Sequence, residues 1–152
     1  MDVVDRKILA ELQTDGRLTV TDLADRVHLS VSRCQRRLRE LERTGVIRGY
    51  HAVVNAAAVG LGFEVLAFAT LRQENQDTLT AFDEAVAAIP HVVQAQRLFG
   101  DPDYLLRVVT ADLAAYQRLY EEKLVRLPGV QRISSTIVMK QVVDTRPLPA
   151  QP

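Results

Sequence analysis

The chain has 152 residues, of which 47% are hydrophobic and 25% charged, and this composition excludes a chain that stays disordered along most of its length. The single cysteine excludes an intramolecular disulfide framework and is typical of a reducing compartment, so we expect a cytoplasmic protein. The formal net charge is zero, which taken alone argues against nucleic acid as a partner, but residues 30–50 hold six arginines against two glutamates. A basic segment therefore lies within a neutral chain.

Two stretches bear on membrane targeting. The opening sequence MDVVDRK is too charged for the apolar core of a secretory signal peptide. Residues 52–71 are largely apolar, but an asparagine, a glutamate and two glycines interrupt them. A polar or charged group in mid-span is costly, so we predict no membrane partner.

Three short helices are predicted in the first part of the chain. The first follows Asp2, a favourable N-cap residue, and repeats apolar residues at helical spacing up to an Asp-Gly stop. The second opens at Thr19, and the third runs from Ser30 as N-cap to Thr44. Two helices joined by a turn of about three or four residues, with arginines on the second, form the layout of a helix-turn-helix that reads DNA.

The third helix has an apolar side and a basic side. Helical geometry places its apolar residues on one stripe, with Ser32, Arg36, Arg39 and Arg43 on the opposite side. Arg37 is expected nearer the edge of the core.

This basic side predicts contacts with double-stranded DNA. The N-terminal part of the second helix of such a motif enters the major groove, so Ser32, Arg33 and Arg36 are the candidates for base edges. Arginines further along the segment are expected to reach phosphates. The predicted DNA-binding residues are Ser30, Ser32, Arg33, Arg36, Arg37, Arg39, Arg43 and Arg48. The alternative is a solvated charged face without a partner.

The cysteine and the histidines indicate no bound metal. Cys34 falls on the apolar stripe of the third helix, so we expect a small core residue rather than a redox sensor. His28, His51 and His91 lack the spacing of metal ligands, and no cysteine pair accompanies them. We therefore assign no metal and no cofactor.

The rest of the chain predicts a linker followed by two similar halves. A short strand is expected over residues 46–54, before a connection that ends at Gly62. The elements expected after it are a strand at 63–72, a helix at 77–89, strands at 91–99 and 104–110, a helix capped by Asp112, and a strand at 130–143. This is the order of the ferredoxin-like sandwich, an antiparallel sheet with both helices on one face.

The fold class is therefore α+β, with an N-terminal helix-turn-helix of the winged-helix-like type and a C-terminal ferredoxin-like βαββαβ domain. The boundaries we expect are 1–50 for the DNA-binding domain, 51–62 for a strand and linker, 63–143 for the ferredoxin-like domain and 144–152 for a flexible tail. The second face of the sheet is left bare, and an uncovered apolar sheet indicates a partner, most economically a second copy of the chain. Residues expected to line this face are Val65, Ala67, Leu106, Val108, Ile137 and Met139.

Seven short stretches, taken in order and spacing, resemble the Lrp/AsnC family of bacterial and archaeal transcription regulators. They are DRKIL at 5–9, DGR at 15–17, LSVS at 29–32, RLRELE at 37–42, GVI at 45–47, GDPDYLL at 100–106 and LPGV at 127–130. The resemblance covers nearly the whole chain. It implies an effector-binding and oligomerisation role for residues 63–143, homodimers joined through the sheets, often octamers, and small molecules, commonly amino acids, bound between subunits of adjacent dimers.

The glycine-x-x-aspartate turn of this family corresponds to Gly100 and Asp103, where the family places its effector response. A carboxylate there could hold an α-ammonium group, and backbone N–H groups of a glycine turn could take an α-carboxylate. The predicted effector-binding residues are Gly100, Asp101, Asp103, Tyr104, Ser134 and Thr136. The alternative for the turn is a plain hairpin connection.

The leading functional hypothesis is a sequence-specific, dimeric or larger DNA-binding transcriptional regulator, not an enzyme, whose DNA binding or assembly responds to an amino acid. Two alternatives remain open. Some proteins similar to this family by fold decarboxylate a modified tetrapyrrole, although no paired histidine or carboxylate cluster stands out in this chain. An architectural DNA-binding protein with weak sequence preference is the other.

Overall fold

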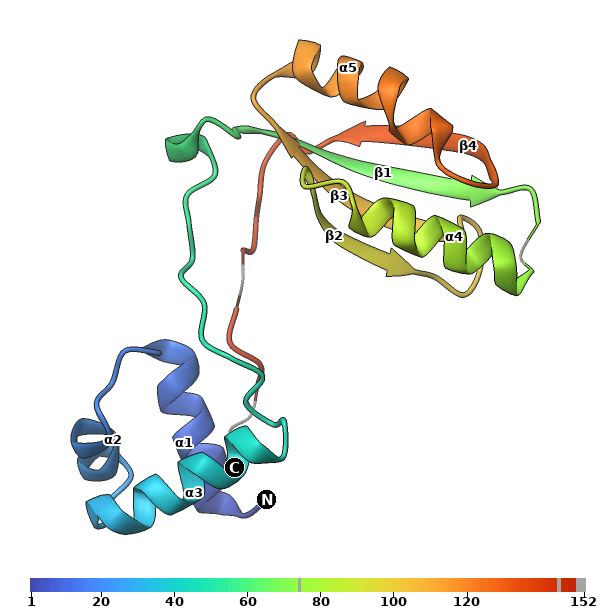
Figure 1. Cartoon of the computed structure of the whole chain (residues 1–152). Helices are drawn as coiled ribbons and strands as arrows, with labels where there is room; N and C mark the ends of the chain where they lie inside the picture. Colours follow the sequence, from blue (N-terminus) through green and yellow to red (C-terminus); the bar gives the residue numbers. More distant parts are fainter. Residues whose placement is uncertain (74, 145, 150–152) are drawn as a thin grey trace. The chain divides into compact units, whose positions relative to one another are not determined.

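The computed structural model describes residues 1–73, 75–144 and 146–149. The chain forms two compact units, one of residues 1–53 together with the segment from residue 142 onward, and one of residues 54–141. Figure 1 shows helices without a sheet in the first unit and a sheet with helices packed on it in the second. Each unit has its own buried core, so each is described by itself.

The three predicted helices of the N-terminal unit are confirmed. They are α1 (Val3–Thr14), α2 (Val20–Arg26) and α3 (Val31–Arg43). Asp2 caps α1 in a capping box, since its carboxylate accepts from the Asp5 N–H at 2.9 Å while the Asp5 carboxylate accepts from the Asp2 N–H at 2.9 Å. Thr19 caps α2 by accepting from the Asp22 N–H at 3.1 Å. Ser30 stands at the N-cap position of α3, as predicted, but makes no side-chain capping bond.

The core of this unit holds the helices together around α3. Its buried residues are Ile8, Leu23, Ala24, Val27, Cys34 and Leu41. The expectation that Cys34 fills the core is confirmed, since the residue is fully buried. The turn between α2 and α3 places His28 at φ +57°, a left-handed conformation that lets the chain reverse direction over a few residues.

The strand predicted over residues 46–54 is wrong. These residues have no strand beside them among the described parts of the chain, and Val53 and Val54 are exposed. Residues 46–54 are rich in β-branched side chains, but a strand needs a hydrogen-bonding partner, and the described residues supply none there.

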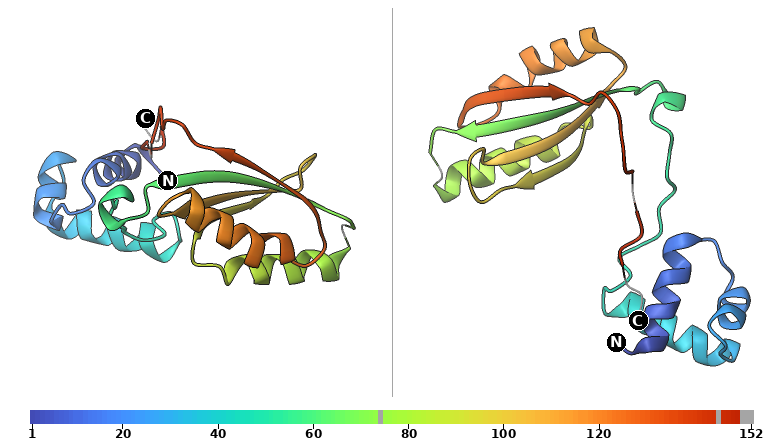
Figure 2. Two further views of the ribbon diagram at one scale, coloured as in Figure 1. Left: turned by 90° about the horizontal axis from the view of Figure 1, so that it is seen from above. Right: turned by 180° about the vertical axis from the view of Figure 1, so that it is seen from behind.

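The C-terminal unit has the predicted ferredoxin-like order. Its elements are η1 (Ala57–Val59), β1 (Phe63–Leu71), α4 (Gln76–Ala87), β2 (Val92–Arg97), β3 (Tyr104–Thr110), α5 (Leu113–Glu122), η2 (Leu124–Arg126) and β4 (Val130–Ile137). The strands form one antiparallel sheet in the order β2-β3-β1-β4. Both long helices cover the same face (Figure 2), so the predicted fold class is confirmed. The last strand stops at Ile137, six residues before the predicted end at 143.

The residues predicted for the bare face of the sheet are wrong. Val65, Ala67, Leu106 and Val108 are fully buried under the helices. Side chains of a strand alternate between the two faces of the sheet. If one residue is assigned to the wrong face, all the other residues of that strand are assigned to the wrong face as well. Ile137 lies opposite Val65 in the pairing, and Met139 lies beyond the end of β4.

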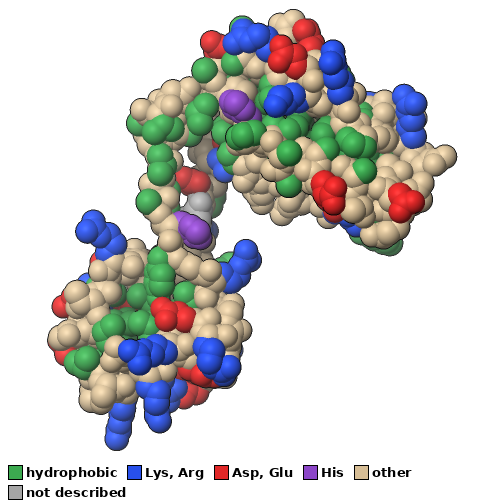
Figure 3. All heavy atoms as spheres, viewed as in Figure 1, with side chains coloured by type: hydrophobic (Ala, Val, Ile, Leu, Met, Phe, Trp, Pro, Cys, Tyr) green, Lys and Arg blue, Asp and Glu red, His purple; other side chains and the backbone are tan. Residues whose placement is uncertain are grey.

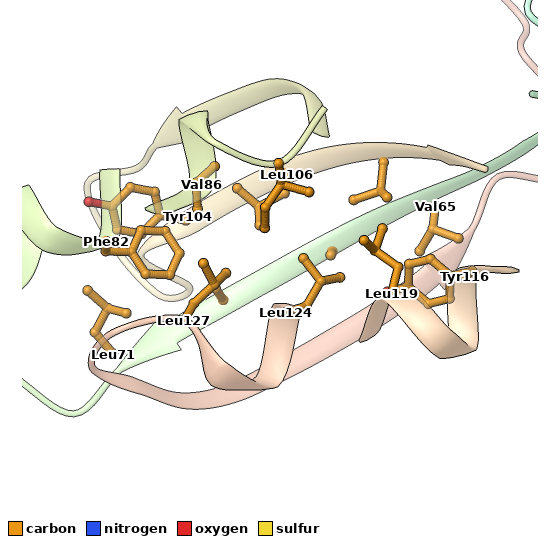
Figure 4. Close-up of a cluster of buried hydrophobic side chains, with 14 residues drawn as sticks. Val65, Leu71, Phe82, Val86, Tyr104, Leu106, Tyr116, Leu119, Leu124 and Leu127 are labelled. Carbon is orange, nitrogen blue, oxygen red and sulfur yellow. The ribbon is translucent and has the colours of Figure 1, made fainter. Parts of the chain in front are cut away.

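The bare face consists of the alternate residues. Leu66 and Phe68 of β1 lie opposite Arg107 and Leu105 of β3, and all four are half-buried. The opposite face carries the core of the unit, with Phe82 of α4 stacked at 4.3 Å between ring centres on Tyr104 (Figure 4). This apolar layer fixes the sheet and so positions the turn between β2 and β3.

Residues 144–152 are predicted to be a flexible tail, but within this segment Leu148 has a hydrogen-bonding partner. Its backbone is hydrogen-bonded to the side chain of Gln13 in α1. Residues 145 and 150–152, also part of the predicted tail, lie outside the described residues.

Candidate functional site

The outward side of α3 presents a polar, mainly basic surface. Lys and Arg side chains gather along the α3 side of the N-terminal unit (Figure 3). A shallow hollow of about 340 Å³ on this side is lined by Ser32, Gln35, Arg36, Arg39, Glu40 and Arg43. The amphipathic pattern of the helix produces this surface, because Cys34 and Leu41 turn inward to the core.

The structure separates the predicted arginines into paired and unpaired groups. Arg37 reaches back to α1, where its guanidinium lies 2.8 Å from the Asp2 carboxylate and 2.7 Å from that of Asp5. Hydrogen bonds to Asp5 and Asp2 raise the pKa of Arg37, and the residue is a tie between α1 and α3. Sequence periodicity predicts that Arg37 lies near the edge of the core, as it does. It does not predict the carboxylate partners Asp2 and Asp5.

Arg43 is held within its own helix. Its guanidinium donates to both carboxylate oxygens of Glu40, at 2.9 and 2.5 Å. This hydrogen-bonded pair lowers the pKa of Glu40 and raises that of Arg43. Because Glu40 neutralises part of its charge, Arg43 is less available than the unpaired arginines to bind a phosphate.

Four of the predicted arginines remain exposed, and none of them forms an ion pair with a described residue. They are Arg33, Arg36, Arg39 and Arg48. The Ser30 and Ser32 hydroxyls lie 3.5 Å apart at the start of α3, where both are exposed. Guanidinium groups without carboxylate partners can bind phosphates or guanine edges without first breaking an ion pair.

The residues after α3 are tied back to the helix by Tyr50. Its hydroxyl donates to the Glu42 carboxylate at 3.0 Å, and burial together with this bond raises the pKa of Tyr50 to about 12. The ring also lies against Gly16, since a Cβ at that glycine would be 3.7 Å from it. The neighbourhood of Arg48 is thereby fixed to the helical unit.

A second candidate site lies in the C-terminal unit, at the turn between β2 and β3. Two adjoining hollows of about 400 and 220 Å³ share Thr70, Asp101 and Arg132. Gly100 and Asp103 line the larger hollow, and Ser134 lines the smaller. The pairing of β1 with β4 sets Thr70 opposite Arg132 and Phe68 opposite Ser134, so these polar groups share the bare face.

The site brings opposite charges to its rim. Asp101 and Arg132 are both exposed, and neither forms an ion pair within the described part of the chain. A carboxylate and a guanidinium at one hollow are suited to a zwitterion such as an α-amino acid.

Of the predicted effector residues, Tyr104 and Thr136 line neither hollow, and Asp103 lines the larger hollow but is also bound to β1. The buried Asp103 carboxylate accepts from the Leu71 N–H at 2.6 Å, which fixes the turn to β1. Tyr104 points to the helix-covered face, where its hydroxyl donates to Asp83 at 2.7 Å, and burial raises its pKa to about 12. Thr136 lies on the bare face but lines neither hollow.

Sequence reasoning missed Gln35, Thr70 and Arg132. The first could have been found from its helical spacing, three residues after Ser32 and four before Arg39. Arg132 is two residues before Ser134, which places both on one face of a strand. Thr70 carries no such signal, because only the strand pairing brings it to the hollow.

Two family descriptions match successive parts of the chain. Residues 1–48 match the winged helix-turn-helix DNA-binding family, and residues 64–148 match the Lrp/AsnC ligand binding domain. The chain belongs to the Lrp/AsnC family. As a family member it is a DNA-binding transcriptional regulator with a ligand-binding domain.

Similar proteins match nearly the full length of this chain. The leucine-responsive regulatory protein of Rhizobium meliloti is 39% identical over 144 residues, covering 95% of this chain and 92% of the relative. That of Escherichia coli K12 is 38% identical, covering 97% and 90%. A transcriptional regulator from Neisseria meningitidis, solved with L-methionine, has a TM-score of 0.93 at 36% identity, covering 98% and 96%. An AsnC family regulator from Agrobacterium tumefaciens has a TM-score of 0.92 at 39% identity, covering 98% and 97%.

The described residues contain neither a membrane-spanning helix nor a cluster of metal-ligating side chains. No helix there is both long and apolar enough to cross a membrane. No group of three or more histidine, cysteine or acidic side chains that could hold a metal ion occurs in the same part of the chain.

Proposed function

We propose that this Lrp/AsnC regulator reads an operator sequence through the exposed side of α3 and that an amino acid at the turn between β2 and β3 modulates this binding. The observation that carries the proposal is the set of unpaired arginines on α3. Arg33 and Arg36 lie in the N-terminal half of the helix, the part that such motifs insert into the major groove.

Each residue has an expected role at the DNA. Arg36 and Gln35 are the candidates for bidentate contacts, the first with guanine and the second with adenine. Arg39 and Arg48 are assigned to phosphates, and Arg43 contributes once Glu40 releases it. Arg37 positions α3 rather than contacting DNA, because Asp2 and Asp5 already hold its guanidinium.

The effector is proposed to be an amino acid held between Asp101 and Arg132. Asp101 would take the α-ammonium group and Arg132 the α-carboxylate, with the Gly100 backbone and the Ser134 hydroxyl as further hydrogen-bonding groups. The similarity to a regulator solved with L-methionine supports this class of ligand. Asp103 is assigned the support of the turn.

We also propose a cytoplasmic homodimer joined through the bare face of the sheet, with octamers formed from such dimers. Leu66, Phe68 and Leu105 provide the apolar part of that face. Covering partly exposed apolar side chains is the driving force for association. No catalytic step is assigned to this chain.

The DNA proposal is tested by selecting bound fragments from genomic DNA and measuring affinity for the selected operator as salt is varied. Arg36→Ala is expected to weaken operator binding about tenfold or more and to relax specificity. Arg39→Ala is expected to weaken binding to all DNA sequences equally. It should also reduce the slope of log K against log salt concentration by about 0.9.

Arg118→Ala is the matched control, because it removes one exposed arginine from the C-terminal unit. Equal affinity for operator and random DNA at matched salt would support the architectural alternative. An Arg36→Ala protein that binds operator like the wild type would contradict the proposed role of α3.

The effector proposal is tested by calorimetry with each of the twenty amino acids. Arg132→Ala should abolish the heat of binding that the wild type gives with its effector, whereas Arg118→Ala should retain it. Optical titration with a tetrapyrrole tests the enzyme alternative, which a spectral change would favour.

A further inference from the structure

The side chain of Gln13, near the end of α1, binds one peptide unit at the far end of the chain. Its Nε2 donates to the Leu148 carbonyl at 3.2 Å, and its Oε1 accepts from the Leu148 N–H at 2.6 Å. One side-chain amide thus satisfies both backbone groups of one residue, as a neighbouring β-strand would. The two residues are 135 positions apart in the sequence.

The sequence around Leu148 singles out this peptide unit. Pro147 and Pro149 flank it, and proline has no backbone N–H, so Leu148 carries the single N–H donor of this tripeptide. Gln13 accepts from that donor. Pro149 also restricts Leu148 to extended conformations, so little conformational entropy is lost when the segment binds.

The contact is directed at the backbone rather than the leucine side chain. Leu148 is 75% exposed, so its side chain contributes little packing. The described residues 142–144 and 146–149, here called the C-terminal strap, follow β4 in the sequence and belong to the N-terminal unit.

We propose that the surface of α1 at Gln13 is a docking site for the C-terminal strap of the same chain. The proposed docking fixes the segment that follows β4 to the unit that carries α3. Leu148 lies eleven positions after Ile137, the end of β4, so the tether keeps the local concentration of the strap high, and two hydrogen bonds suffice to hold it.

Docking itself is independent of the proposed function. Its consequence for regulation, a further restraint on the unit that carries α3, rests on that function. The two can therefore be tested apart.

The test is amide hydrogen exchange and nitrogen NMR on the full-length protein. In the wild type the Leu148 amide is expected to exchange about tenfold more slowly than in Gln13→Ala, because the substitution removes both hydrogen bonds. Leu148→Pro removes the N–H donor to Gln13 Oε1 but keeps the carbonyl acceptor and the extended backbone, so the loss of this one bond should shift the Gln13 side-chain amide signal from its wild-type position. Leu148→Ala is the matched control and should keep both signals as in the wild type.

Mixed dimers decide which chain supplies the strap. When labelled wild-type chains are paired with excess unlabelled Gln13→Ala chains, docking within one chain predicts that the labelled Leu148 stays protected. Loss of protection in this mixture, or equal exchange of Leu148 in wild type and Gln13→Ala, would overturn the proposal. A protected Leu148 in a protein that fails to bind DNA would leave docking supported and would refute only the proposed function.

Discussion

Both units of this regulator contain paired arginines, but α3 of the N-terminal unit also carries exposed arginines without an ion-pair partner among the described residues. In the C-terminal unit, Arg97 is paired with Asp83 and Arg107 binds both oxygens of Glu64 at 2.8 Å. In the N-terminal unit, Arg33, Arg36 and Arg39 on α3 have no carboxylate partner among the described residues, whereas Arg43 is paired with Glu40. Arg37 and Arg97 are bound to carboxylates and support the fold, whereas the unpaired arginines of α3 are the ones proposed to contact DNA.

The units also differ in how their cores are built. The C-terminal unit buries an extended apolar layer between a sheet and two helices, including Phe82 and Leu106. The N-terminal unit buries six residues and adds the ion pairs of Arg37 to join α1 and α3. We therefore expect the units to respond separately to substitutions in their cores.

The largest expected effect is that of Phe82→Ala. Removing this fully buried ring should lower the free energy of unfolding of the C-terminal unit by about 3–5 kcal/mol. Urea unfolding followed by tyrosine fluorescence measures the loss. Thiol labelling of the buried Cys34 reports the N-terminal unit and should be unchanged; faster labelling would show that the two units unfold together.

Ile8→Ala tests the other core. Loss of this fully buried side chain should cost the N-terminal unit about 2–5 kcal/mol. Cys34 should then react faster with thiol reagents, while the tyrosine-detected transition of the C-terminal unit keeps its midpoint. An unchanged labelling rate would contradict the packing of Ile8 against α3.

Asp103→Ala separates fold support from effector binding. It leaves the buried Leu71 N–H without its acceptor, so we expect a loss of about 1–3 kcal/mol in the C-terminal unit. Asp101→Ala removes an exposed carboxylate nearby and should leave stability unchanged while weakening effector binding. The reverse pattern in urea unfolding and calorimetry would assign Asp103 to the effector.

Arg37→Ala and Arg36→Ala test the paired and unpaired classes within one helix. The first should destabilise the N-terminal unit by about 0.5–1 kcal/mol because it breaks the ties to Asp5 and Asp2. The second should leave stability unchanged and weaken DNA binding. Thermal unfolding and operator affinity are measured on both variants. If Arg37→Ala and Arg36→Ala changed stability and DNA affinity in the same way, the distinction between paired and unpaired arginines would be contradicted.

The smallest expected effect is a pH dependence at Asp2. The hydrogen bond from the Asp5 N–H and the guanidinium of Arg37 hold the pKa of Asp2 below its ordinary value. A carboxyl whose pKa is lowered on folding stabilises above its unfolded pKa, and this stabilisation is lost as pH falls through the folded value. Asp2→Asn keeps an N-cap group and should reduce the loss of stability of the N-terminal unit between about pH 6 and about pH 3. The rate of Cys34 labelling, measured at each pH, reports this stability.

Local sequence patterns predicted much of the fold. The caps at Asp2 and Thr19, the apolar stripe through Cys34 and the order of the C-terminal elements all follow from neighbouring residues, and the structure has them. The faces of the sheet were assigned wrongly because the strand run from Phe63 alternates poorly, so the sequence did not show which alternate residues turn inward. Part of the candidate site was found, since Gly100, Asp101 and Ser134 do line the hollows, but Thr70 and Arg132 reach them only through strand pairing.

The sequence by itself determined the helix-turn-helix, its basic side and the βαββαβ order, because these depend on periodicity, capping and turn residues a few positions apart. The tertiary structure decided which charged and polar groups are free. It pairs Arg37 with α1, gives Asp103 to Leu71, and brings Leu148 to Gln13. Each of these contacts joins residues at least 32 positions apart, and only the packing of elements against one another brings such groups within hydrogen-bonding distance.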